Sequence, residues 1–136
     1  MVYPLQPRGM NNQRLHKLIE GTGTDVQGEL GYWQFIAHGA QVWCITDETH
    51  DRMRVMAPIA EIENVTTEEI HACMEANFDR ALDARYCMRN GQLFGAYIHP
   101  LSPLTENQFL SAVHQVVAVE ANFGSTYSSS ELFFGG

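Results

Sequence analysis

The apolar residues of this chain follow a helical spacing in three segments and a strand-like spacing between them. Near the start, Leu15, Leu18 and Ile19 fall on one side of a helix, and Gly21 ends the segment. The polar, glycine-rich stretch over residues 20–31 has neither spacing. This part of the chain therefore predicts a short first helix followed by a loop.

The second helical segment has a clear start. Thr66 and Glu69 stand three residues apart, as in a capping box, and Val65 and Ile70 are placed to form a hydrophobic staple around it. An apolar stripe follows at helical spacing: Ile70, Met74, Phe78 and Ala81, flanked by Cys73 and Leu82. The segment predicts an amphipathic helix with this stripe as its apolar side.

The third helical segment begins in the same way. Thr105 and Gln108 form its capping box, and the helix is expected to run to about Phe123, with Gly124 as its stop. Glu120 falls near the centre of the apolar stripe, where a buried carboxylate without a partner is costly. Either Glu120 lies beyond the edge of the core, or it pairs with a basic residue, within the chain or across a subunit interface.

Five shorter runs have the apolar content of strands. They cover residues 32–37, 41–46, 52–59, 84–89 and 92–99. Asn90-Gly91, between the last two, is a strong hairpin signal. The order α-βββ-α-ββ-α predicts one α+β domain over residues 1–136, an antiparallel sheet with helices packed on it. Residues 1–9 and 125–136 are expected to be terminal extensions, the second docking its apolar tip, Leu132, Phe133 and Phe134.

Two of these strands are apolar on both faces. Side chains alternate along a strand, so Val42 and Cys44 point one way while Trp43 and Ile45 point the other. The last strand follows the same rule, with Leu93 and Tyr97 opposed to Phe94, Ala96 and Ile98. Helices cover one sheet face; the second is covered by helices or the tail, by another copy of the chain, or by a client protein.

The residues expected to bind a partner on the second face are Trp43, Ile45, Phe94 and Ile98. The alternation alone leaves open which face the helices cover. Tryptophan in a small domain is usually highly buried, which favours a core position for Trp43. If the helices instead cover the Val42 face, Trp43 is left for a partner.

Composition narrows the classes of partner. Acidic residues outnumber lysine plus arginine by 16 to 8, for a formal net charge of −8, and no basic run is visible. This balance argues against nucleic acid and against anionic membrane surfaces. The first residues lack the apolar stretch of a signal peptide, and no run is long enough to span a bilayer. We therefore expect a cytoplasmic protein that binds neither nucleic acid nor a membrane.

The residues with reactive side chains form no recognisable catalytic pattern. Cys44, Cys73 and Cys87 are an odd number without paired spacing and are expected to be reduced, buried small hydrophobes. His99 precedes a proline-rich corner, with Glu106 as the one carboxylate within ten residues. No metal-binding, nucleotide-binding or nucleophile motif is present. We expect no catalytic residue, no cofactor and no metal, with His99 as a corner residue.

Particular stretches of the second half resemble a known family. "ALDARYCMRNGQLFGAYIHPLSPLTENQFLSAVHQVV", followed by "NFGSTYSSSELFF", resembles the YbjN family of bacterial proteins, and the resemblance covers roughly residues 10–134. The order of elements is also that of type III secretion chaperones. The resemblance implies a chaperone-like fold, a homodimer, and protein binding in place of catalysis. The family is labelled as sensory-transduction regulators, and it supplies no catalytic motif to carry over.

The expected function is therefore a non-catalytic cytoplasmic module, chaperone-like or regulatory, that binds a protein client or itself as a homodimer. The alternative is a small-molecule-binding protein or an enzyme that uses the His99 corner. A deep, polar-lined pocket around His99 would favour the alternative, whereas a flat apolar surface would favour protein binding.

Overall fold

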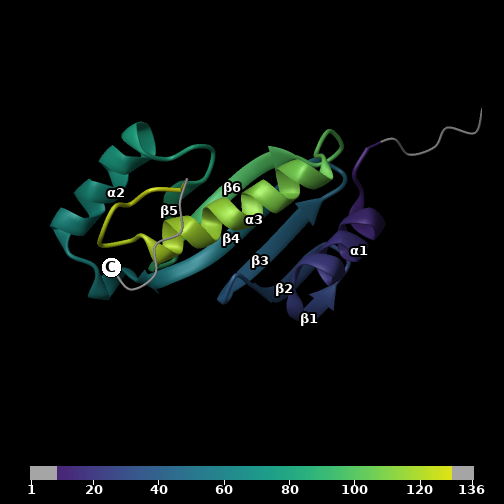
Figure 1. The fold of residues 1–136 in the computed structure, drawn as a ribbon, viewed down its shortest axis with the longest axis horizontal. Helices are drawn as coiled ribbons and strands as arrows, with labels where there is room; N and C mark the ends of the chain where they lie inside the picture. The colour runs from purple at the N-terminus through teal and green to yellow at the C-terminus, as the bar shows by residue number, and fades with distance from the viewer. Residues whose placement is uncertain (1–8, 130–136) are drawn as a thin grey trace, which may run out of the picture.

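The computed structural model describes residues 9–129. Its helices are α1 (Asn12–Thr22), α2 (Thr67–Asp79) and α3 (Glu106–Ala121), with a 3-10 turn, η1 (Ile62–Asn64). Its strands are β1 (Thr24–Glu29), β2 (Tyr32–Ala37), β3 (Ala40–Asp47), β4 (Arg52–Glu61), β5 (Arg85–Arg89) and β6 (Gln92–Pro100). All neighbours pair antiparallel, in the order β1-β2-β3-β4-β6-β5 (Figure 1). The predicted α+β class and order of elements are confirmed, with one strand more than expected.

The additional strand is β1, which occupies the stretch expected to be a loop. Its residues are almost all exposed, because backbone pairing with β2 rather than apolar burial holds it at the edge of the sheet. Its register shifts between Thr24 and Gln27, as in a β-bulge, and Gly28 has φ 106°. A Cβ on Gly28 would lie 2.2 Å from the carbonyl oxygen of Tyr32, so only glycine fits. A bulged, polar edge of this kind discourages pairing with another chain.

The capping and hairpin signals in the sequence are confirmed, whereas the predicted stop at Gly21 is wrong, because α1 continues to Thr22 and its C-cap is Gly23. Both capping boxes are present: Thr66 and Glu69 exchange bonds of 3.1 and 2.9 Å at the start of α2, and Thr105 and Gln108 do the same at the start of α3. Asn90 (φ 50°) and Gly91 (φ 77°) form the turn between β5 and β6, the two left-handed residues of a type I′ hairpin.

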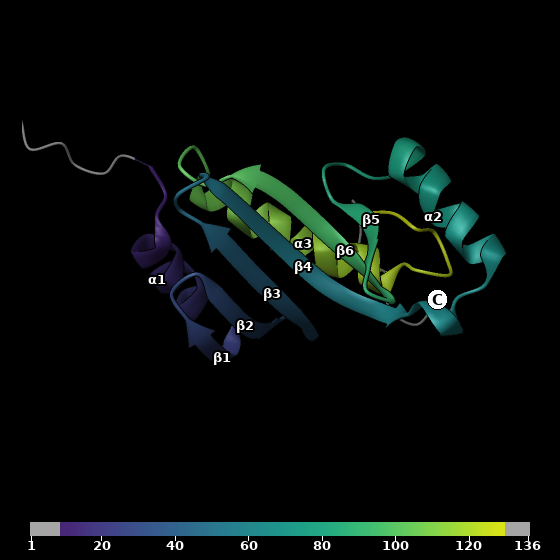
Figure 2. The ribbon, with the colours of Figure 1, turned by 180° about the vertical axis from the view of Figure 1, so that it is seen from behind.

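α1 and α3 lie on the same face of the sheet. α3 runs along β4 and β6, and α1 lies beside β1 and β2 (Figures 1 and 2). Between these helices and the sheet lies the core, whose largest fully buried side chains include Leu15, Ile19, Trp33, Phe35, Met53, Val55, Phe109, Val113 and Val116. Gly95 allows this close approach, because a Cβ there would lie 2.8 Å from Cγ1 of Val119 on α3.

α2 lies beyond β5, at the end of the sheet (Figure 1). The side-chain amide of Asn77 accepts a hydrogen bond from the backbone N–H of Tyr86 at 2.8 Å and donates one to the backbone carbonyl of Tyr86 at 3.1 Å. Through these bonds α2 covers part of the open β5 edge. The chain after α3 closes this end, where the Ser129 hydroxyl accepts from the Leu82 N–H at 2.6 Å. The predicted extension is therefore packed up to residue 129, and its expected docking tip lies outside the described residues.

The apolar stripe predicted for α2 is only partly used. The residues that α2 buries are Cys73, which was predicted to flank the stripe, and Ala76, which lies outside it. Met74 is 49% exposed and Phe78 is 91% exposed. α2 contacts the sheet along the β5 edge and also lies near Tyr127 in the segment after α3, while an apolar ridge, formed by Met74 and Phe78, points outward.

Candidate protein-binding surface

The two faces of the sheet differ in what covers them. Val42 and Cys44 are completely buried under the helices, whereas Trp43 and Ile45 point to the other side and are partly exposed. Seen from behind in Figure 2, the strands lie in front of α3, and no helix of residues 9–129 crosses them on this side. The favoured core position of Trp43 is therefore wrong. The buried tryptophan is Trp33, whose Nε1 donates to Nδ1 of His16 at 3.0 Å.

Cross-strand register joins the apolar residues of this side into one surface, which we call the bare face. Trp43, Met56 and Ala96 form one row across β3, β4 and β6. The next row pairs Ile45 with Arg54 and Arg54 with Ile98. The apolar members of the bare face include Tyr32, Ile36, Trp43, Ile45, Met56, Pro58, Phe94, Ala96, which is buried, and Ile98. The four residues predicted to bind a partner thus share one surface.

Arginines gather on the same face. β4 presents Arg52 and Arg54 there, and β5 presents Arg85 and Arg89, which together are half of the 8 lysines and arginines in the chain. The two pairs are remote in sequence. They share one face of the sheet because β4 and β5 both pair with β6, one on each side of it. The alternation of Arg52 and Arg54 with apolar Met53 and Val55 was the one signal of this cluster in the sequence.

Arg54 is the cation at the centre of the bare face. It is exposed, and its guanidinium makes no ion pair or hydrogen bond with any residue between 9 and 129. Arg85 differs, because its guanidinium donates to the carbonyls of Leu82 at 2.7 Å and Ala84 at 3.2 Å. Arg54 therefore offers unused donors in the middle of an apolar surface.

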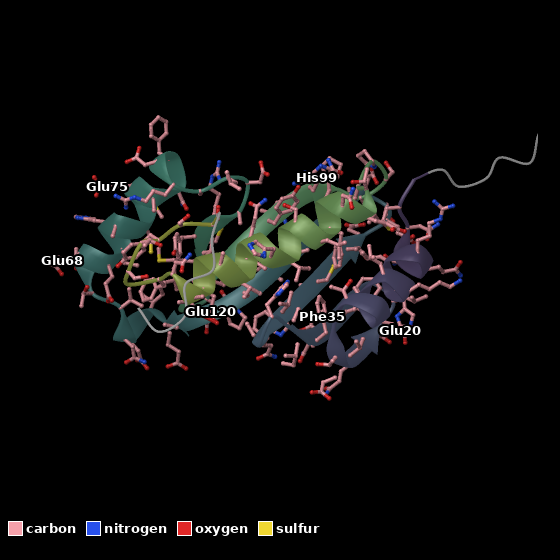
Figure 3. The ribbon with its side chains drawn as sticks, in the orientation of Figure 1. Glu20, Phe35, Glu68, Glu75, His99 and Glu120 are labelled. Atoms are coloured by element: carbon pink, nitrogen blue, oxygen red, sulfur yellow. The ribbon has the colours of Figure 1, made fainter. Side chains whose placement is uncertain are left out.

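Carboxylates stand at the rim of the bare face and over the rest of the molecule. Glu29, Asp47 and Glu61 occupy strand ends, and Asp47 lies opposite Arg52. A hydrogen bond from His50, 2.7 Å away, lowers the pKa of Asp47. Glu20, Glu68 and Glu75 project outward from α1 and α2 (Figure 3). The centre of the bare face is thus positive in a chain whose net charge is −8.

The His99 corner is held together by its own backbone and by Asp51. Nδ1 of His99 lies 2.7 Å from the carbonyl oxygen of Pro100, and its ring stacks on Tyr97 at 5.9 Å between centroids. The Asp51 carboxylate accepts from both the N–H and the hydroxyl of Ser102 at 2.7 Å. No carboxylate within residues 9–129 pairs with His99. The geometry is that of a corner residue.

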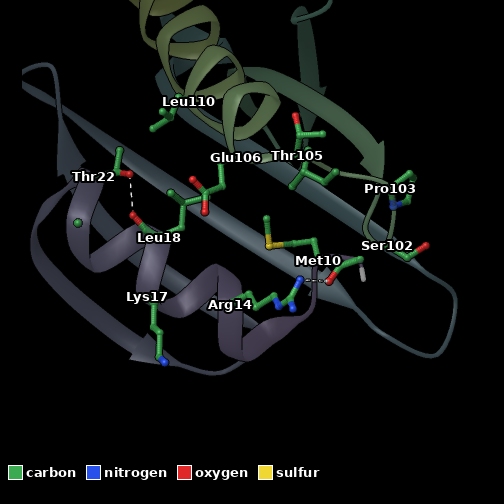
Figure 4. A pocket seen from close by; sticks show the side chains of 13 residues that line it. Met10, Arg14, Lys17, Leu18, Thr22, Ser102, Pro103, Thr105, Glu106 and Leu110 are labelled. Carbon is green, nitrogen blue, oxygen red and sulfur yellow. Dashed lines mark hydrogen bonds between the residues drawn. The ribbon is translucent and has the colours of Figure 1, made fainter. Parts of the chain in front are cut away.

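A cavity lies near this corner, between α1 and the start of α3 (Figure 4). It has a volume of about 780 Å³, and His99 is not among its lining residues. Two of its polar side chains have partners: Arg14 donates to the Gly9 carbonyl at 3.1 Å, and Thr105 caps α3. The cavity therefore gives no support to a reaction centred on His99.

Burial perturbs the pKa values of the cysteines and of Glu120. Burial raises the pKa of Cys73 to about 11 and that of Cys44 higher still, so both thiols remain protonated. Cys87 was expected to be buried but is partly exposed on the bare face. Partial burial raises the pKa of Glu120, which forms no ion pair among the described residues. No group of three or more potential ligands within residues 9–129 is placed to hold a metal.

No family model matches this chain, and no curated protein matches it. Among the described residues, none of the helices has both the length and the apolar content to span a bilayer.

Proposed function

We propose that this chain is a non-catalytic protein-binding module, chaperone-like or regulatory, that binds a client protein on the bare face and acts as a cytoplasmic homodimer. The observation that carries the proposal is the group of apolar side chains that extends across β3, β4 and β6 around Arg54, on the side away from the helices. Contiguous apolar surfaces of this kind mark interaction sites. Trp43 lies on this surface, in the row with Met56 and Ala96, and tryptophan is a residue type enriched at binding hot spots.

The homodimer is proposed to form through the outward side of α2, so that the bare face stays open for the client. Met74 and Phe78 provide the apolar contact. The helix begins with Glu68 and Glu69 and is followed by Arg80. Two copies of α2 packed antiparallel would therefore place Arg80 of each copy beside the acidic first turn of the other. Such a contact is self-complementary, as a two-fold interface requires.

A pair of matched variants tests client binding. Ile98 on the bare face is 50% exposed, and Leu30, in the turn between β1 and β2, is 53% exposed and lies on the α1 side. Immobilised wild-type chain, Ile98→Asp and Leu30→Asp are each incubated with native cytoplasm. We expect the client captured by the wild type and by Leu30→Asp to be lost with Ile98→Asp. Equal capture by all three forms would contradict the proposal.

The dimer is tested separately by multi-angle light scattering. The wild-type chain should give a particle of twice 15.3 kDa at micromolar concentration, and Phe78→Asp should give the monomer mass. Because Phe78 is almost fully exposed, its replacement should leave the fold intact, which circular dichroism checks. A chain ending at residue 129 serves as the second variant. If that truncation alone abolished the dimer, the tail rather than α2 would carry the contact.

A further inference from the structure

We infer that the client segment on the bare face is an acidic amphipathic helix, which presents a carboxylate to Arg54 and apolar side chains to Ile45 and Ile98. This inference rests on the proposed function and names the chemistry of its partner. Its starting point is the guanidinium of Arg54, which has no partner among residues 9–129 and lies in the row between the apolar residues Ile45 and Ile98.

Any occupant that covers this surface also covers Arg54. Neighbouring strands lie about 4.8 Å apart, so a segment that contacts both Ile45 and Ile98 must pass over the Arg54 side chain between them. Removing a cation from water without supplying an opposite charge is strongly unfavourable. A purely apolar or a basic segment is therefore disfavoured, whereas a carboxylate would pair with Arg54 and would leave the apolar contacts on both sides.

The spacing of the row suits a helix laid across the strands. Ile45 and Ile98 are two strands apart, roughly 9.6 Å. Helix residues i and i+7 lie on one side and are roughly 10.5 Å apart, with i+3 and i+4 between them. The expected pattern is an apolar residue at i, Glu or Asp at i+3 or i+4, and an apolar residue at i+7. The neighbouring row of Trp43, Met56 and Ala96 would support the rest of the apolar side.

The charges around the bare face favour this occupant over two others. A second copy that stacked its own bare face here would bring the two arginine clusters together, and like charges at an interface oppose binding. Nucleic acid would meet the carboxylates of Glu29, Asp47 and Glu61 at the rim, in a chain with a net charge of −8. A client helix with a single carboxylate among apolar residues would place that carboxylate beside Arg54, at the positive centre of the bare face.

The experiment uses three fluorescein-labelled helical peptides of about 18 residues, a length at which designed sequences are helical. All three have leucine at positions i and i+7. They differ only in the residue between these leucines, at i+3 or i+4, which is Glu, Gln or Lys. Binding to the full chain is followed by fluorescence anisotropy at low salt. We expect the Glu peptide to bind about tenfold more tightly than the Lys peptide, a preference that salt reduces. Arg54→Gln should remove the preference, and Arg54→Glu should reverse it.

The possible failures are distinguishable. If no peptide binds the wild type, or if Ile98→Asp leaves all binding unchanged, the proposed client surface itself is wrong. If the three peptides bind equally and Ile98→Asp abolishes binding, the surface stands and the acidic partner is overturned. Tighter binding of a short oligothymidylate than of the Glu peptide would overturn it in favour of nucleic acid. Loss of the dimer with Ile98→Asp, but not with Phe78→Asp, would assign the face to a second copy.

Discussion

Replacing Trp43 by alanine tests the central structural feature, a side of the sheet that no helix of residues 9–129 covers. A tryptophan packed on both ring faces buries roughly 200 Å², which corresponds to about 5 kcal/mol at 25 cal/mol per Å². Trp43 is covered by the sheet and its strand neighbours but not by a helix of residues 9–129. Its truncation should therefore remove roughly half of this burial free energy, about 2.5 kcal/mol. No enclosed cavity forms on truncation, so the cavity term of core substitutions is missing.

The indole nitrogen of Trp43 lowers this value further. Its N–H is buried and has no hydrogen-bond partner among residues 9–129, so removing it relieves an unfavourable state. We expect Trp43→Ala to reduce the free energy of unfolding by about 2 kcal/mol. Trp33→Ala, which empties a fully buried site and breaks the bond to His16, should cost at least about 3–5 kcal/mol.

Urea unfolding followed by far-UV circular dichroism measures both variants without relying on tryptophan fluorescence. The same preparations are then assayed for client capture, where Trp43→Ala should weaken binding by about 2 kcal/mol or more if it is a hot spot. A loss of stability for Trp43→Ala as large as that for Trp33→Ala would refute an uncovered face. Unchanged stability together with unchanged binding would refute both a packing and a binding role.

Three further predictions concern the corner, the thiols and the contact between α3 and the sheet. His99→Ala should cost about 1 kcal/mol or less in urea unfolding, as for a replaceable hydrogen bond, and should not change client capture; loss of an enzymatic activity with the fold intact would show a catalytic role. The pKa of Cys73 is raised by burial from 9.0 to about 11, so its contribution to stability is fully present below pH 9.0 and is lost as pH rises through about 11. Urea midpoints should therefore fall over this range, and Cys73→Ala should reduce the fall; an equal fall in both proteins would speak against it. Gly95→Ala should destabilise by about 1–3 kcal/mol, because its Cβ would meet Val119. Gly21→Ala, where nothing lies within 4 Å in helix α1, should instead stabilise by about 0.5–1 kcal/mol, and thermal unfolding that ranked the two glycines the other way would contradict the packing.

The sequence alone determined those features that a few neighbouring residues satisfy among themselves. Thr66 with Glu69, and Thr105 with Gln108, exchange hydrogen bonds within one helical turn, so the starts of α2 and α3 could be predicted. Asn90-Gly91 adopts the left-handed turn for which these residues are suited, so the β5–β6 hairpin could be predicted as well.

β1 was missed because its stabilisation is not local. Its exposed side chains show no alternation of apolar and polar residues, and the strand is held by backbone pairing with β2. The stripe of α2 was misplaced for a related reason. Helical spacing shows that Met74 and Phe78 share a side with other apolar residues, but Asn77, which binds the β5 edge, sets the rotation of the helix and leaves that ridge outside.

The candidate surface was half determined by the sequence. Alternation in β3 separates Val42 from Trp43, but the two faces are similarly apolar, so periodicity cannot say which one the helices cover. Only the docking of α1 and α3 decided this, because each helix buries its own stripe against one side of the sheet. Likewise, Arg54 and Arg85 are thirty-one positions apart in the sequence. They share a face because the strand order places β6 between β4 and β5, a long-range pairing that no local pattern encodes.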